Sequence, residues 1–189
     1  MSDVPSVLPT SGTVRPITRW GEPVMHRTQE PITEFGEELQ ALVADLVATM
    51  YAADGVGLAA CQVGVDRAVF VFDCPDEHGV RHQGVVCNPE LLLPTGKDRT
   101  LDDDEEGCLS LPGAFVSCAR PSYARVDGQD LTGGPVSFSG RGLLARCLQH
   151  ETDHCHGVVF GDRLNRRSRK KLFKEAAEVA EDFGPEWPA

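Results

Sequence analysis

The sequence has no long hydrophobic run and is short of basic side chains. No segment approaches the about 18 consecutive apolar residues of a membrane span, so we expect no membrane partner. Lys and Arg number 18 against 29 Asp and Glu, which gives a net charge of −11. Because a general nucleic-acid-binding protein carries an excess of positive charge, this balance argues against DNA as a partner.

The cysteines lack any repeated spacing, and their number, seven, is odd. Disulfide-bonded domains carry even numbers of cysteines at regular spacings, so this pattern favours a reduced protein. The N-terminal residues also lack the basic region followed by an apolar stretch that marks a secretory signal. We therefore expect a cytoplasmic protein.

The chain length of 189 residues is about that of one domain with a single core. Its hydrophobic content of 41% is too high for a disordered chain. It contains no internal repeat and no interior linker, so we expect residues 1–189 to form one domain. We expect residues 1–12, which are rich in Pro, Ser, Gly and Thr, to be flexible.

The hydrophobic pattern predicts three helices and several short strands. The helices are expected at residues 33–53, 142–154 and 165–182. The strands are expected at residues 68–72, 85–87, 115–118 and 123–126, and a hairpin is expected from Val126 to Val136. Helices interspersed with short strands favour an α+β fold with short mixed or antiparallel sheets.

The most informative pattern is HETDH at residues 150–154, an instance of HExxH. In a helix, residues four apart lie on one face, so His150 and His154 can converge on one metal ion. Glu151 is then placed to act on a water molecule bound to that ion. The alternative is two helix histidines that bind no metal. We take the metal interpretation, which makes this the central, metal-binding helix.

A catalytic site of this kind needs a third protein ligand. Cys147 lies on a similar face of the same helix, but its short side chain cannot reach far enough along the axis. Two kinds of candidate remain elsewhere in the chain. One is Cys108, and the other is a downstream acid, Glu175 or Glu178, as in metallopeptidases with two His and one Glu. The residues alone leave this choice open.

Three separated segments together resemble the peptide deformylase family. They are GVGLAACQ at residues 55–62, EGCLS at residues 106–110 and QHETDH at residues 149–154. The resemblance extends over about residues 15–175. It implies a single catalytic domain, expected to be monomeric. It also implies a metal-dependent hydrolase of protein biosynthesis that removes the N-formyl group from the initiator methionine of nascent polypeptides and releases formate.

The resemblance also implies the metal ligands. Cys108, His150 and His154 would bind one divalent ion, and ferrous iron is expected, with zinc, nickel or cobalt able to take its place. Such an ion lowers the pKa of bound water enough to create a nucleophile near neutrality. Cys61 and Cys155 depart from the residues usual in the family, do not replace a ligand, and add thiols near a redox-sensitive metal.

Four further residues take catalytic roles by the same resemblance. Glu151 would accept the proton of water and later deliver it to the departing amine. The Gln62 side-chain amide and the Leu109 backbone N–H would stabilise the charge that develops on the formyl oxygen. Gly57 would provide a backbone contact to the substrate, since a residue without Cβ allows close approach.

An acidic run, DDDEE, occupies residues 102–106 just before Cys108. A calcium or magnesium site is conceivable there, but the run has no alternation of ligands, so we interpret it as a solvated loop. Glu106 belongs to the family motif. We expect an arginine to hold it, either Arg120 or Arg146.

A basic run of opposite character lies between Arg163 and Lys174. It contains seven basic residues and no acid, which leaves a charge of −18 on the rest of the chain (−11 − 7). A positive stripe on an acidic protein is suited to RNA, so it predicts contact with the ribosome. The alternative is a solvated helix face. A ribosome-associated module with a purely structural metal is the non-enzymatic rival.

Overall fold

The computed structural model describes residues 8–189, which contain three helices and seven strands. The helices are α1 (Glu37–Ala52), α2 (Leu143–Cys155) and α3 (Arg166–Glu178). The strands are β1 (Gly57–Ala59), β2 (Val69–Pro75), β3 (Arg81–Leu92), β4 (Leu101–Cys108), β5 (Leu111–Pro121), β6 (Tyr123–Gln129) and β7 (Pro135–Arg141). The prediction of an α+β fold with three helices is confirmed. None of the helices described is long and apolar enough to cross a membrane.

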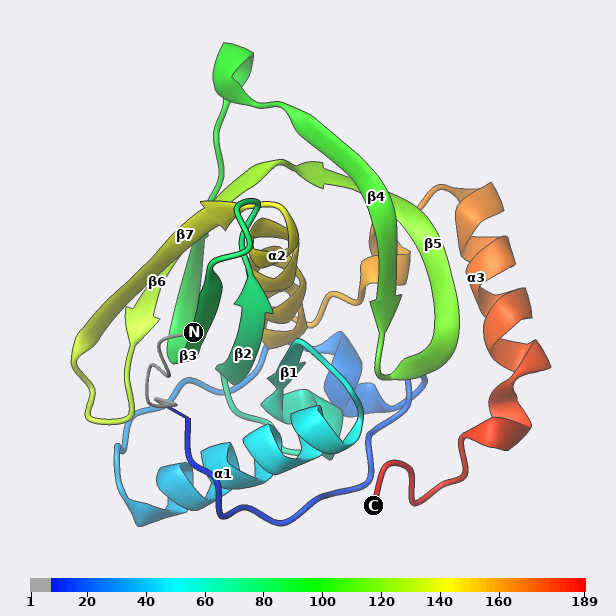
Figure 1. Cartoon of the computed structure of the whole chain (residues 1–189). Helices are drawn as coiled ribbons and strands as arrows, with labels where there is room; N and C mark the ends of the chain where they lie inside the picture. The colour runs from blue at the N-terminus through cyan, green and yellow to red at the C-terminus, as the bar shows by residue number, and fades with distance from the viewer. Residues whose placement is uncertain (1–7) are drawn as a thin grey trace.

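The strands form two antiparallel sheets. The larger has the order β1-β2-β3-β6-β7, and the smaller consists of β4 and β5. Figure 1 shows β4 and β5 as a long curved arm beside the larger sheet, with α3 running alongside the arm. Helix α2 packs against β2, β3, β6 and β7, while α3 packs against β5. Helix α2 is therefore enclosed by strands.

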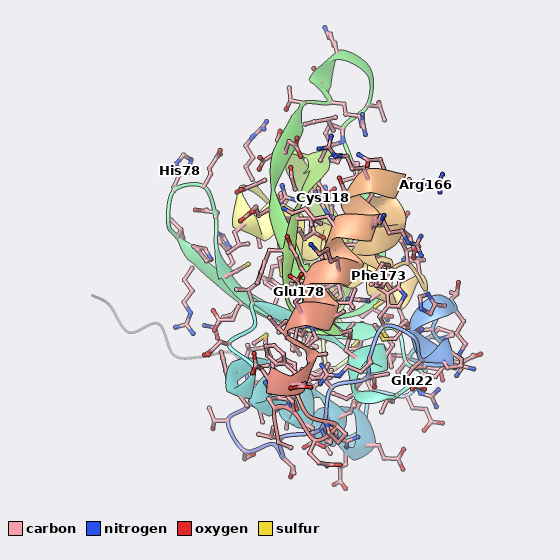
Figure 2. The ribbon with its side chains drawn as sticks, turned by 90° about the vertical axis from the view of Figure 1, so that its right-hand side faces the viewer. Glu22, His78, Cys118, Arg166, Phe173 and Glu178 are labelled. Atoms are coloured by element: carbon pink, nitrogen blue, oxygen red, sulfur yellow. The ribbon has the colours of Figure 1, made fainter. Side chains whose placement is uncertain are left out.

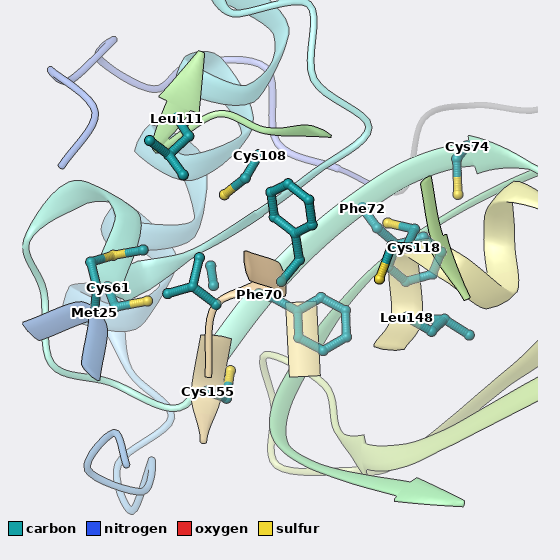
Figure 3. Close-up of a cluster of buried hydrophobic side chains, with 14 of the residues drawn as sticks. Met25, Cys61, Phe70, Phe72, Cys74, Cys108, Leu111, Cys118, Leu148 and Cys155 are labelled. Atoms are coloured by element: carbon teal, nitrogen blue, oxygen red, sulfur yellow. The ribbon is translucent and has the colours of Figure 1, made fainter. Parts of the chain in front are cut away.

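Strand β2 is apolar at successive positions because both of its faces are covered. Phe70 and Phe72 belong to a buried cluster that includes Leu144 and Leu148 of α2. Figure 3 shows several members of this cluster. Val69 and Val71 point the other way, into a second cluster that contains the apolar residues of α1. A strand covered on both faces has a continuous apolar run rather than an alternating pattern.

Helix α2 is buried along almost its whole length, although many of its side chains are polar. Every residue after Leu143 is buried. These include Arg146, Glu151 and Asp153. Because an unpaired buried charge is costly, these groups require partners from other elements. Those partners define the site described below.

Several predicted boundaries are corrected by the structure. The acidic residues 102–106 do not form a loop but lie in β4, paired with β5 in the register Asp102↔Arg120 to Glu106↔Val116. Asp103, Asp104 and Glu105 are exposed and, of these acidic residues, only Glu106 is buried, while the backbone pairs with β5, so no apolar alternation marks the segment as a strand. Helix α1 begins at Glu37, and α3 ends at Glu178, before a separate turn at Ala180–Asp182.

The N-terminal segment expected to be flexible falls partly outside the described residues, since these begin at residue 8. Leu8 is 3% exposed and belongs to the cluster around α1. Gly12 lies so close to the helix that an added Cβ would come within 1.8 Å of the Ala44 carbonyl oxygen. Residues 8–12 therefore pack against α1.

Leu148 of α2 provides a test of this packing. Its side chain is 0% exposed, whereas that of Leu92, at the end of β3, is 41% exposed. We expect Leu148→Ala to lower the free energy of unfolding by about 2–5 kcal/mol, because it removes buried methyl groups and leaves a cavity. The matched change Leu92→Ala should alter it by less than about 0.5 kcal/mol. Urea unfolding of both variants in one buffer measures the difference, and equal losses would contradict this packing.

Candidate functional site

Three buried side chains converge where α2 meets the end of β4. The ligand atoms of Cys108, His150 and His154 all lie within 4.8 Å of one another. Cys108 Sγ lies 3.5 Å from His154 Nε2, which is itself 3.1 Å from His150 Nε2. Among residues 8–189, this is the one group of three or more Cys, His, Asp or Glu side chains with that geometry. One thiol and two imidazoles suit a divalent transition metal.

Glu106 orients the first of the two histidines. Its Oε1 lies 2.7 Å from His150 Nδ1, so Nδ1 donates to the carboxylate and Nε2 is directed into the cluster. Arg120 donates to both carboxylate oxygens, at 2.7 and 2.6 Å, and Arg146 donates to Oε2 at 3.0 Å. The expectation that Arg120 or Arg146 would hold Glu106 is met by both.

The charge of Glu106 is stabilised despite its burial. Burial by itself raises the pKa of this carboxyl, but the hydrogen bonds from Arg120 and His150 outweigh it and hold the pKa well below its usual range. Asp153 continues the network, since it accepts from Arg120 Nη1 at 2.9 Å and from Arg163 Nε at 2.8 Å. Neither Asp153 nor Arg163 was predicted as a site residue. The position of Asp153 inside the HETDH segment was the signal that could have indicated it.

Glu151 lies beside the cluster in a closely packed position. It is 4% exposed, and burial raises the pKa of its carboxyl to about 7. Within residues 8–189, its Oε2 has no hydrogen-bond partner. A Cβ added at Gly57 would lie only 2.6 Å from Glu151 Oε1, so this glycine makes room for the glutamate as well as for any ligand.

The amide of Gln62 is held in one orientation. Its Oε1 accepts a hydrogen bond from the backbone N–H of Ala59 at 2.9 Å, so the NH2 group must point the other way. Its Nε2 lies 3.7 Å from Cys108 Sγ and 3.4 Å from Ser110 Oγ. A donor is therefore directed at the space beside Cys108.

Most of these residues line one cavity of about 480 Å³, a volume within the range of ligand pockets, whereas His154 is fully buried and is not part of its lining. Of the residues singled out from the sequence, it is lined by Gly57, Gln62, Cys108, Leu109, His150 and Glu151. Leu109 lies in the turn between β4 and β5. Phe183 and Trp187, from the C-terminal segment, line the same cavity and were not anticipated.

Other candidates lie apart from this cavity. Glu175 and Glu178 form ion pairs with Lys171 and Lys174 on α3, at 3.5 Å each, so neither joins the histidines. Cys61 is buried in the core, where its Sγ lies 3.7 Å from the carbonyl oxygen of His154. All seven cysteines are free thiols.

Comparison with known proteins gives consistent matches. The family model described as Polypeptide deformylase matches residues 14–170. Peptide deformylase 1 of Streptomyces avermitilis is 54% identical over 167 residues, which cover 88% of this chain and 77% of that protein. Peptide deformylase 2 of Streptomyces coelicolor is 49% identical over 169 residues, which cover 89% of this chain and 93% of that protein.

Solved structures agree. The peptide deformylase of Legionella pneumophila superposes with a TM-score of 0.78 at 36% identity, covering 89% of this chain and 96% of that one. That of Synechococcus elongatus in complex with actinonin gives a TM-score of 0.77 at 31% identity, covering 98% of this chain and 100% of that one. The chain therefore belongs to the polypeptide deformylase family, metal-dependent enzymes that remove the N-formyl group from nascent polypeptides.

Proposed function

We propose that Cys108, His150 and His154 hold one divalent ion at which this chain hydrolyses the N-formyl group of the initiator methionine. The observation that carries the proposal is the convergence of these three side chains at a cavity that Cys108, His150 and Glu151 line. Two hydrophobic clusters that meet at β2 support a single catalytic domain. We further propose that it acts in the cytoplasm, because its substrate is a chain still under synthesis. We also propose that it acts as a monomer.

The residues present fit a metal ion. His150 would bind an ion through Nε2, since Nδ1 is hydrogen-bonded to Glu106. Burial lowers the pKa of His154 well below its usual range, which favours the neutral imidazole that a metal requires. We propose ferrous iron, and the same sulfur and nitrogen donors suit zinc, nickel or cobalt. A bound ion supplies Lewis acidity, which acidifies water and polarises a carbonyl.

The protein side chains then move protons and stabilise charge. Glu151 accepts a proton as water adds to the formyl carbon, and it returns the proton to the amine nitrogen as the C–N bond breaks. Formate and a free amino terminus are the products. Negative charge that develops on the formyl oxygen is stabilised by the Gln62 Nε2 amide and the Leu109 backbone N–H. Gly57 contacts the substrate through its backbone.

We also propose that the basic residues between Arg163 and Lys174 contact the ribosome. Within residues 8–189, Arg166, Arg167 and Lys170 take part in no ion pair and are exposed. Figure 2 shows Arg166 and Glu178 at opposite ends of α3. Positive charge is therefore concentrated in the first turns of α3, where it can meet phosphate groups.

Glu151→Gln tests the catalytic role of the glutamate. We expect formate release from a formyl-Met peptide to fall at least about 100-fold, because the amide can neither accept nor return the proton. The metal content of anaerobically purified protein should stay the same, since Glu151 is not a proposed ligand. An enzyme with unchanged activity in this variant would instead favour a module with a purely structural metal.

Cys108→Ala and Glu175→Ala test the choice of third ligand. Loss of the thiolate leaves two protein ligands, so we expect Cys108→Ala to lose both the metal and formate release. Glu175→Ala removes only an exposed ion pair on α3 and should retain both. Elemental analysis measures the metal content of the two purified variants. Metal retained in Cys108→Ala and lost in Glu175→Ala would favour a metallopeptidase with two His and one Glu.

Ribosome contact is tested by replacing the three unpaired basic residues, Arg166, Arg167 and Lys170, with Ala. We expect the unaltered protein to co-sediment with ribosomes at low salt and to dissociate as salt rises, because phosphate contacts release counterions. The triple variant should sediment less. Lys97→Ala with Arg99→Ala, two exposed basic residues in the connection between β3 and β4, is the control. Binding that is independent of salt, or absent at low salt, would contradict the proposal.

A further inference from the structure

The C-terminal segment after α3, residues 179–189, contributes two aromatic walls to the catalytic cavity. The family model ends at residue 170, so this segment lies outside the matched region. Phe183 and Trp187 nevertheless line the same cavity as Cys108 and Glu151. Figure 1 shows the segment turning away from α3 and ending below the lower ends of β4 and β5. These walls thus lie beyond the part of the chain that the family model matches.

We infer that Phe183 and Trp187 form a subsite that binds large apolar or aromatic side chains of the peptide beyond its formyl-methionine. This inference rests on the proposed function, because it assumes that the cavity holds a formylated peptide. Reaction at the formyl group fixes one end of that peptide beside Cys108 and Glu151. The rest of the peptide must then extend along the remaining walls of the same cavity.

The segment is anchored and does not hang free at the chain end. Arg19 Nη2 donates to the carbonyl oxygens of Phe183 and Gly184, at 3.1 and 2.9 Å. The same guanidinium lies over the ring of Trp187, 5.4 Å from its centroid. The backbone N–H of Ile17 donates to the Trp187 carbonyl at 2.9 Å. These contacts hold both rings in place before any peptide binds, which limits the entropy lost on binding.

The two rings also support each other. Phe183 and Trp187 pack edge to face, with centroids 5.1 Å apart and planes at 86°. On its other side, Phe183 packs against Gly113 of β5, where an added Cβ would lie 2.9 Å from Phe183 Cε2. Both aromatic side chains remain only half-buried. Part of each ring is therefore open to a ligand in the cavity.

The cavity volume and the chemistry of its walls indicate the occupant. About 480 Å³ is enough for a drug-sized ligand, which is larger than one methionine side chain. Aromatic walls bind most strongly to ligands that can stack on the rings or bury apolar surface against them. The favoured peptides therefore carry Phe, Tyr or Leu, and not Ser or Asp, after the methionine.

The test compares formyl-Met-Phe-Phe with formyl-Met-Ala-Ala. In the unaltered enzyme we expect KM to be about tenfold lower for the aromatic peptide. Phe183→Ala combined with Trp187→Ala should abolish this preference by raising KM for formyl-Met-Phe-Phe, while the metal content stays the same. Phe173→Ala is the matched control, because Phe173 is a half-buried aromatic on α3 that packs on Trp20 and does not line the cavity. The control should keep the preference.

A spectroscopic measurement covers the case in which the double variant fails to fold. The chain has two tryptophans, so in Trp20→Phe all tryptophan emission comes from Trp187. With Glu151→Gln added to prevent turnover, formyl-Met-Phe-Phe should change this emission saturably, and formyl-Met-Ala-Ala should require about tenfold more peptide.

Two results would overturn the inference: a preference that persists without both aromatic rings, or Trp187 emission that stays unchanged at saturating peptide. If the unaltered enzyme released formate from neither peptide, the proposed function itself would fail, which is a separate outcome.

Discussion

The carboxylate of Glu106 is the group on which the interior of this protein depends. It accepts hydrogen bonds from His150, Arg120 and Arg146, all of them buried. A buried network of this kind is stable only while each charge keeps its partner, and removing one partner of a buried pair costs about 3–5 kcal/mol. The buried Arg146 and His150 of helix α2 therefore depend on the Glu106 carboxylate that β4 places beside them.

The same strand places the thiol. Glu106 and Cys108 are two residues apart in β4, and both are buried, as expected for residues that share one face of a strand. Glu106 holds Nδ1 of His150, while Cys108 Sγ faces the ring of His154. The ion pairs of α2 and the proposed metal ligands therefore form one arrangement, in which the pairing that stabilises the core also orients the cluster.

The remaining parts of the site are arranged by close packing. Gly57 leaves space for Glu151, the Ala59 N–H fixes the direction of the Gln62 amide, and Gly113 lets Phe183 reach the cavity. Each depends on a backbone that comes unusually near a side chain. The C-terminal segment extends the same cavity with aromatic surface, so the catalytic end and the proposed peptide subsite lie in one continuous space.

Features that depend on residues close together in the chain could be predicted from the sequence alone. The four-residue spacing of His150 and His154 placed both on one face of a helix, and the apolar run of β2 indicated a buried strand. The resemblance indicated Cys108 as the third metal ligand, a choice that the residue spacing left open between Cys108 and Glu175 or Glu178. The pairing of residues 102–106 as a strand, and the contact of both Arg120 and Arg146 with Glu106, became apparent only in the folded chain. The reason is sequence distance: His150 meets Glu106 across 44 residues, and Arg19 meets Phe183 across 164, so no local pattern encodes either contact.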